Sequence, residues 1–177
     1  MIKRFILIFA VFLVSPHLSA DIYSANQALA RGDARTAAEE FKRLAKLGDA
    51  RAQAHLAYMY YIGEGVTQSY TEAVYWYEKA AVQGNRDAQY NLAVAYAFGE
   101  GVEQDLIKAS TWYRRAADQG HIVAQYSLGI SYIYGEGVNQ DLVQAFEWIK
   151  KSAVDRLQAV GILYNTVIRR RALTSTS

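Results

Sequence analysis

Three glutamates recur along the chain, 36 residues apart, and each lies between two glycines: Glu64, Glu100 and Glu136. The metal that such loop carboxylates suggest is calcium, which takes six or more oxygen ligands in proteins. A single recurring carboxylate per loop falls well short of that number. We therefore predict that these glutamates are solvated or bond to backbone groups, and that they hold no metal.

Two histidines beyond residue 20, His55 and His121, are the remaining candidate metal ligands or general bases. The two histidines occupy different positions within the 36-residue unit. Neither has a second histidine at a sequence spacing typical of metal ligands. The chain has no cysteine, which excludes disulfides, thiolate metal sites and a cysteine nucleophile. No sequence motif of a hydrolase, a phosphate-binding loop or a zinc protease is present. We predict no catalytic residue, no metal and no cofactor.

Aromatic side chains offer a different chemistry, that of binding. The segments 52–62, 88–98 and 124–134 contain no Asp, Glu, Lys or Arg, and each has uncharged residues where a surface helix would be polar. Tyrosine combines apolar area with a hydroxyl group and loses little side-chain entropy, as interface residues do. We predict that these helices line a groove for a partner protein; the alternative is that they fill the core between neighbouring repeats. The predicted partner-binding residues are Tyr58, Tyr61, Tyr90, Val94, Tyr126 and Ile130.

The elements that position these residues come from an internal repeat. Aligning residues 52–87 with residues 88–123 gives 17 identities in 36 positions, and 12 positions are identical when residues 124–156 are added. Such a period is typical of helical repeat arrays, in which stacked units share one core. Within a unit, residues of one helical stripe recur every four positions, a Gly-x-Gly loop follows, and a second stripe contains a tryptophan. The predicted structural residues are Leu56, Tyr60, Gly63, Gly65, Trp76, Leu92, Tyr96, Gly99, Gly101, Trp112, Leu128, Tyr132, Gly135, Gly137 and Trp148.

Each unit is predicted to form two antiparallel helices, which makes the whole an all-α solenoid. The first helix ends at the Gly-x-Gly loop because glycine accepts the left-handed conformation that terminates helices. The second begins at a residue whose side chain accepts hydrogen bonds from free amide groups: Ser69, Asp105 or Asp141. Residues 21–51 fit a shortened N-terminal repeat, and the three full repeats are 52–87, 88–123 and 124–156. Residues 157–177 fit a degenerate capping helix and tail, or the remnant of a longer array.

Residues 1–20 are predicted to be a secretory signal peptide. Lys3 and Arg4 precede an apolar run over 5–14, and small residues follow, so we place cleavage after Ala20. The apolar run is shorter than the roughly 20 residues that cross a bilayer, so no stable membrane anchor is expected after cleavage. Removing two of the 19 basic residues and none of the 17 acidic ones leaves a formally neutral chain, which disfavours a nucleic-acid partner.

The pattern Ala-x-x-x-Leu-[Ala/Gly]-x-x-Tyr-x-x-Gly-x-Gly-Val, followed by Ala-x-x-Trp-x-x-x-Ala, resembles the Sel-one-like repeat (SLR) family, relatives of the tetratricopeptide repeats. The resemblance covers residues 52–155 with nearly every hallmark, and the flanking residues more weakly. It implies a right-handed superhelix whose first helices line the concave face and whose members act as adaptors and scaffolds. Some cysteine-rich members have been linked to antibiotic hydrolysis, and the lack of cysteine here disfavours that activity.

The predicted function is that of an exported, periplasmic or secreted adaptor that binds a protein or peptide partner on the concave face, without catalysis. An immunity protein that neutralises a secreted bacterial toxin is the alternative, and a cell-wall glycan-binding or hydrolytic protein is a further one. The sequence leaves the partner and the oligomeric state open. The apolar residues of the C-terminal helix fit either pairing of two copies or a truncated array.

Overall fold

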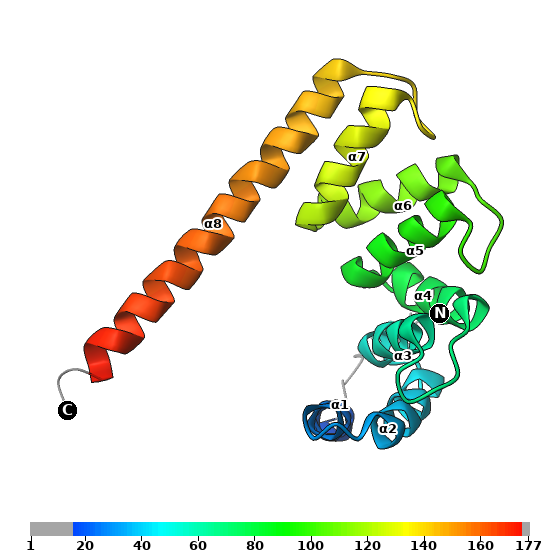
Figure 1. Cartoon of the computed structure of the whole chain (residues 1–177), viewed down its shortest axis with the longest axis vertical. Helices are drawn as coiled ribbons and strands as arrows, with labels where there is room; N and C mark the ends of the chain where they lie inside the picture. The colour runs from blue at the N-terminus through cyan, green and yellow to red at the C-terminus, as the bar shows by residue number, and fades with distance from the viewer. Residues whose placement is uncertain (1–15, 175–177) are drawn as a thin grey trace, which may run out of the picture.

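The computed structural model describes residues 16–174, with side chains for residues 22–158. This part of the chain forms eight helices and no strand, which confirms the predicted all-α solenoid. Most of the predicted signal segment lies outside the described residues. Consecutive helices pack against each other and stack in chain order along a curved array (Figure 1). The helices are α1 (Pro16–Ala30), α2 (Ala34–Lys46), α3 (Ala50–Ile62), α4 (Tyr70–Val82), α5 (Arg86–Phe98), α6 (Leu106–Asp118), α7 (Ile122–Tyr134) and α8 (Leu142–Thr174).

Side-chain caps set where the helices begin. The Ser69 hydroxyl accepts a hydrogen bond from the Glu72 amide, and the Asp105 carboxylate accepts one from the Lys108 amide, as predicted. Asp141 caps α8 in the same way. The first helix of each repeat starts two residues earlier than the predicted repeat boundary, because its cap lies at Asp49, Asn85 or His121.

The two glycines of each loop have different structural roles. The first one ends the helix in the left-handed conformation, as Gly99 does at a φ of 72°. The second one touches the preceding repeat: a Cβ added to Gly101 would lie 2.3 Å from the backbone carbonyl oxygen of Tyr70. Only glycine allows this approach, so the loop backbone packs directly on the start of the preceding repeat's second helix. The same contact recurs at Gly65 and Gly137.

The predicted inward stripes form the core. Leu56, Leu92 and Leu128 are fully buried, and Trp76 is buried as well. Trp112 and Trp148 are partly buried and pack against the same cluster, as do Tyr60 and Tyr132. Burial of these apolar surfaces against the next repeat provides the main stabilisation of a solenoid, since one helix pair cannot cover its own apolar face.

A ladder of glutamines also links the repeats through the core. Gln53, Gln89 and Gln125 occupy one repeat position, are buried, and donate to a backbone carbonyl of the preceding helix. In the first two, the side-chain oxygen accepts a hydrogen bond from a second glutamine 30 residues further on, Gln83 or Gln119. In these two repeats the glutamine therefore satisfies polar groups that the interface would otherwise bury without partners.

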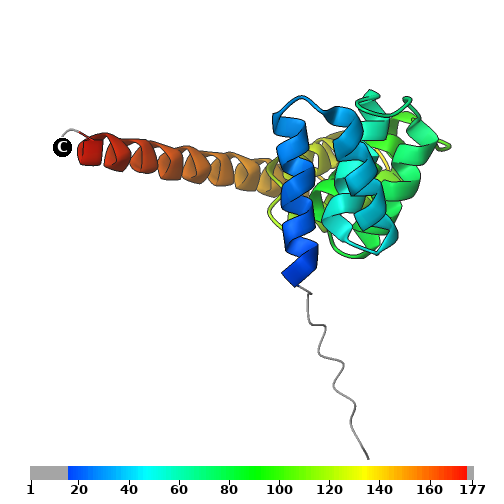
Figure 2. The same cartoon turned by 90° about the horizontal axis from the view of Figure 1, so that it is seen from below.

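The C-terminal part differs from the expectation of a separate capping helix over 157–177. Helix α8 runs without a break from Leu142 to Thr174. The second helices of the preceding repeats end next to glycines in the left-handed conformation, Gly48, Gly84 and Gly120. The residue 36 positions after Gly120 is Arg156, which offers no such termination, so the helix continues. Figures 1 and 2 show α8 projecting away from the stack of shorter helices.

Candidate functional site

The predicted groove residues are all at least partly accessible. None of the nine outer positions of α3, α5 and α7 is buried, although all nine side chains are uncharged. Tyr58 and Tyr126 are about half exposed, at 51% and 48%. The positions are Ala54, Tyr58, Tyr61, Tyr90, Val94, Ala97, Tyr126, Ile130 and Ile133.

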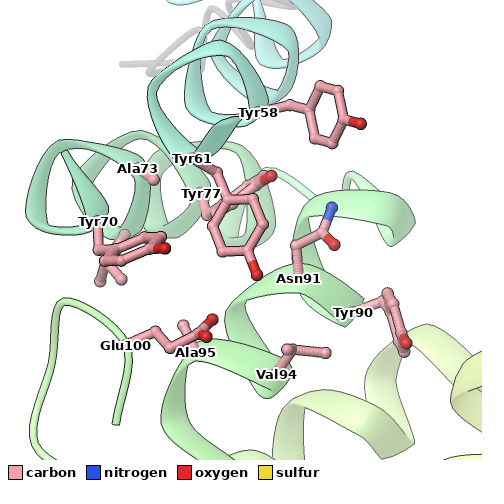
Figure 3. A pocket seen from close by; sticks show the side chains of 11 residues that line it. Tyr58, Tyr61, Tyr70, Ala73, Tyr77, Tyr90, Asn91, Val94, Ala95 and Glu100 are labelled. Carbon is pink, nitrogen blue, oxygen red and sulfur yellow. The ribbon is translucent and has the colours of Figure 1, made fainter. Parts of the chain in front are cut away.

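Four of the six predicted partner-binding residues line one pocket of about 160 Å³, which we call the central pocket (Figure 3). It lies where two successive repeats meet, between α3, α4 and α5. In Figure 3, Tyr70 and Glu100 lie at one end and Tyr58 and Tyr90 at the other, with Tyr61 and Tyr77 between them. Its lining residues are Tyr58, Tyr61, Tyr70, Ala73, Val74, Tyr77, Tyr90, Asn91, Val94, Ala95 and Glu100.

Five tyrosines thus surround the central pocket, and two of them were not predicted as part of a site. Tyr70 follows the Ser69 cap in the first turn of α4, and its ring lies 5.3 Å from the Tyr61 ring. Tyr77 is buried on the inner stripe of α4, and this burial raises its pKa well above the ordinary value for tyrosine. Both rings come from the second helix of the repeat, whereas sequence reasoning looked for the groove on the first helices alone.

Glu100 supplies the charge of the central pocket. It sits between Gly99 and Gly101, so the close approach of Gly101 to α4 brings its carboxylate against the preceding repeat. One oxygen, Oε2, is buried and has no hydrogen-bond partner. Burial raises the pKa of Tyr61, and its hydrogen bond to the Glu100 carboxylate and the negative charge of that group raise it further. Glu100 differs from the predicted solvated or backbone-bonded state at this oxygen, which inter-repeat packing takes out of water, while the residue as a whole is partly exposed.

Equivalent hollows flank the central pocket. A second pocket of about 420 Å³, between α5, α6 and α7, contains the remaining predicted residues, Tyr126 and Ile130, together with Glu136. A third, of about 710 Å³, lies beside α1 and α3 and contains Tyr58 and Glu64. Each pocket thus holds one of the three loop glutamates, and Glu64 and Glu136 are exposed as predicted. We call the row of three pockets the groove.

Tyr90 packs against two aromatic neighbours. Its ring stacks on the His121 ring at a centroid distance of 4.5 Å and lies 5.9 Å from the Tyr113 ring. His121 in turn caps α7, since its Nδ1 accepts a hydrogen bond from the Ala124 amide at 3.1 Å. Burial lowers the pKa of His121. This histidine therefore has a structural role at the boundary of the groove.

His55 also packs structurally, with its ring stacked on Phe41 at a centroid distance of 4.8 Å. Within the described residues, no cluster of three or more His, Asp or Glu side chains has an arrangement that could hold a metal ion. None of the described helices is both long enough and apolar enough to span a membrane. What the groove offers is a surface of aromatic rings, hydroxyl groups and carboxylates, which suits non-covalent binding.

The comparison with protein families matches this architecture. The Sel1 repeat matches residues 50–85, 86–121 and 122–153, which together are more than half of the chain. The chain belongs to the Sel1 repeat family. These segments begin at the first residues of α3, α5 and α7, in agreement with the capped starts of those helices. Sel1 repeat proteins are generally non-catalytic scaffolds for protein interactions.

Solved structures of other Sel1 repeat proteins have similar folds. A protective antigen from uropathogenic Escherichia coli strains, described as displaying an SLR fold, is 38% identical with a TM-score of 0.75; the match covers 77% of this chain and 30% of that one. A Sel1 repeat protein from Oxalobacter formigenes is 28% identical with a TM-score of 0.71, over 76% of this chain and 54% of that one. This Sel1 chain thus spans only about a third and about half of their lengths.

Cysteine-rich protein B of Helicobacter pylori shares the fold at 18% identity, with a TM-score of 0.53 and coverage of 76% of this chain and 90% of that one. The comparison with curated proteins gave no match.

Proposed function

We propose that this Sel1 repeat protein is an exported adaptor that binds a partner protein or peptide in the groove, on the concave face of the solenoid, and has no catalytic activity of its own. The observation that carries this proposal is the accessibility of nine uncharged side chains on α3, α5 and α7. Large exposed aromatic groups on a stable scaffold are costly to hydrate, and they gain most when a partner covers them.

Export to the periplasm or beyond rests on residues 1–20, which have the three regions of a signal peptide. The immunity and cell-wall functions remain alternatives that no feature of the groove favours over adaptor binding.

Affinity capture tests the proposal. The tagged protein would be incubated with periplasmic extract of its own host, and captured proteins would be identified by mass spectrometry. We expect Tyr58→Ala to weaken capture of the specific partner at least about tenfold, as loss of an interface aromatic residue does. Tyr75→Ala is the matched control, because Tyr75 on α4 is 49% exposed, against 51% for Tyr58, and lies outside the three groove pockets.

Circular dichroism would establish that both variants keep their helices. Equal capture by the wild type and Tyr58→Ala would contradict binding at this part of the groove. Co-sedimentation with purified cell-wall sacculi, lost in Tyr58→Ala, would instead support the glycan-binding alternative.

A further inference from the structure

The central pocket combines aromatic walls with an unpartnered carboxylate oxygen. Five of its lining residues are tyrosines, and its one charged side chain, Glu100, has a buried oxygen, Oε2, without a hydrogen-bond partner. A buried acceptor that lacks a donor is energetically unfavourable, and more so when it is charged. A bound group that donates a hydrogen bond to Oε2 would recover this energy.

The protein's own cations do not fill this role. No Lys or Arg is among the residues that line the central pocket. Basic side chains near these residues in the sequence have other partners: Arg86 pairs with Asp87, Lys79 lies over the Tyr75 ring and Lys108 over the Tyr96 ring. The Tyr96 hydroxyl also donates a hydrogen bond to Glu78, so Lys108, Tyr96 and Glu78 have their partners within the chain. The negative charge of the pocket is therefore left without a positive partner.

We infer that the central pocket receives an arginine side chain of the partner, with its guanidinium group bound to the Glu100 carboxylate and stacked among the tyrosine rings. This inference rests on the proposed function, because it names the chemistry of the partner that the groove binds. The negatively charged face of an aromatic ring attracts a cation, and the attraction strengthens when water is excluded.

Arginine fits this pocket better than lysine does. The guanidinium group is planar, is weakly hydrated, stacks on aromatic rings and presents a fork of donors that matches a carboxylate. The central pocket of about 160 Å³ is also of suitable size, since a cavity of about 150 Å³ holds a benzene ring. The strongly hydrated ammonium group of lysine would lose more on entry.

The neighbouring pockets also contain loop carboxylates, and the third pocket contains Arg51 and Asp87 as well. Glu64 and Glu136 occupy the position equivalent to Glu100 in the third and second pockets. Both are exposed, and their pockets have fewer tyrosines, so they attract basic groups without enclosing them. The partner segment is thus expected to be basic overall, with one arginine seated in the central pocket.

The test uses Nα-acetyl-arginine-methylamide as the probe, titrated into the full-length protein carrying labelled tyrosine rings and followed by NMR. We expect shifts in the ring signals of Tyr61 and Tyr70, with a dissociation constant on the order of 1 mM for a ligand of this size. The uncharged analogue of the same shape, Nα-acetyl-citrulline-methylamide, should bind about tenfold more weakly. The lysine probe should bind more weakly than the arginine probe.

Glu100→Gln should weaken binding of the arginine probe about tenfold, because the carboxylate becomes a neutral amide of the same size. Glu103→Gln is the matched control: it removes the same charge from the same loop, and Glu103 is exposed and lines none of the three groove pockets. It should leave the affinity unchanged. Equal binding of the arginine and citrulline probes, an unaltered affinity in Glu100→Gln, or no shift of the tyrosine signals would overturn the inference.

The outcomes separate this inference from the proposed function. Partner capture that is lost in Tyr58→Ala but kept in Glu100→Gln would leave groove binding standing and reject the arginine. Partner capture that is kept in both variants would reject groove binding itself.

Discussion

At the scale of single residues, the groove contains groups that combine a structural role with a proposed role in recognition. Tyr90 illustrates this: it lines the central pocket, and its position is fixed by stacking on His121. His121 can cap α7 only while Nδ1 is unprotonated and free to accept the Ala124 amide. The protonation state of one histidine is thereby coupled to the placement of a groove tyrosine.

This coupling predicts a pH dependence of stability. The pKa of His121 is lowered from 6.5 on folding, so the unfolded chain binds the proton more readily. Stability is complete above about pH 6.5 and falls as the pH drops through the lowered pKa. His121→Asn keeps a cap of the type that Asn85 provides for α5 but cannot titrate in this range.

Thermal unfolding at about pH 7.5 and pH 5.5 checks this prediction, because carboxylates of ordinary pKa stay ionised over that interval. We expect His121→Asn to lose less stability than the wild type between the two pH values. His55 also has a lowered pKa and is present in both proteins, so some dependence should remain. An identical pH dependence in the two proteins would contradict the role of His121.

Residue types and spacing predicted much of this arrangement but not all of it. Tyr58, Tyr61, Tyr90 and Val94 were expected in a groove, and the structure places all four in one pocket. The buried oxygen of Glu100 was not predicted, because a glutamate in a glycine-rich loop has the sequence pattern of a solvated side chain. Its burial depends on contact with another repeat, which spacing within one repeat does not reveal.

At the scale of helices and loops, the second glycine of each Gly-x-Gly loop holds neighbouring repeats together. Gly101 and Gly120 have nearly the same positive φ, 74° and 78°. They differ in surroundings: a Cβ on Gly101 would overlap the backbone of α4, and a Cβ on Gly120 would meet nothing within 4 Å. The two positions therefore separate conformational strain from loss of the inter-repeat contact.

Gly120→Ala should cost about 1–2 kcal/mol of unfolding free energy, the price of a left-handed alanine. Gly101→Ala should cost about 3 kcal/mol or more, since the loop must also move away from α4. Urea denaturation followed by circular dichroism measures both losses. Gly101→Ala should in addition displace Glu100 and weaken binding of the arginine probe. Equal losses of stability in the two variants would show that the contact between Gly101 and α4 does not contribute to stability.

The C-terminal helix shows the limit of repeat patterns at this scale. Residues 142–156 keep the repeat spacing, which predicted a second helix that ends near Arg156. The structure continues α8 to Thr174, because helix termination depends on a local residue, a glycine, rather than on the spacing of core positions. Val143, Phe146 and Leu157 are exposed apolar side chains of α8.

At the scale of the whole molecule, the glutamine ladder runs through successive repeat interfaces and ends imperfectly. In the third repeat, the place of Gln83 and Gln119 is taken by Asp155. Asp155 accepts a hydrogen bond from Gln125 Nε2 at 2.8 Å, whereas the preceding partners donate to the ladder glutamine. Gln125 Oε1 is consequently buried without a donor, and its Nε2 lies 3.4 Å from the Ala117 carbonyl oxygen.

Asp155→Gln should therefore stabilise the protein. A glutamine at this position can donate to Gln125 Oε1, and Gln125 Nε2 can then donate fully to the Ala117 carbonyl, as in the two preceding repeats. We expect a net gain of about 1 kcal/mol in the free energy of unfolding, from satisfying Gln125 Oε1 minus the loss of the hydrogen bond from Gln125 Nε2 to the Asp155 carboxylate. This gain corresponds to a rise of roughly 2–4 °C in Tm for a protein of this size. Differential scanning calorimetry measures the shift.

Asp118→Gln is the control, since it makes the same change at an exposed position of α6 outside the ladder. A Tm that falls in Asp155→Gln, or rises equally in both variants, would show that the ladder does not govern the stability of the third interface. Because repeats in a solenoid are stabilised by their neighbours, a firmer third interface should also slow hydrogen exchange in α7 more than in α1.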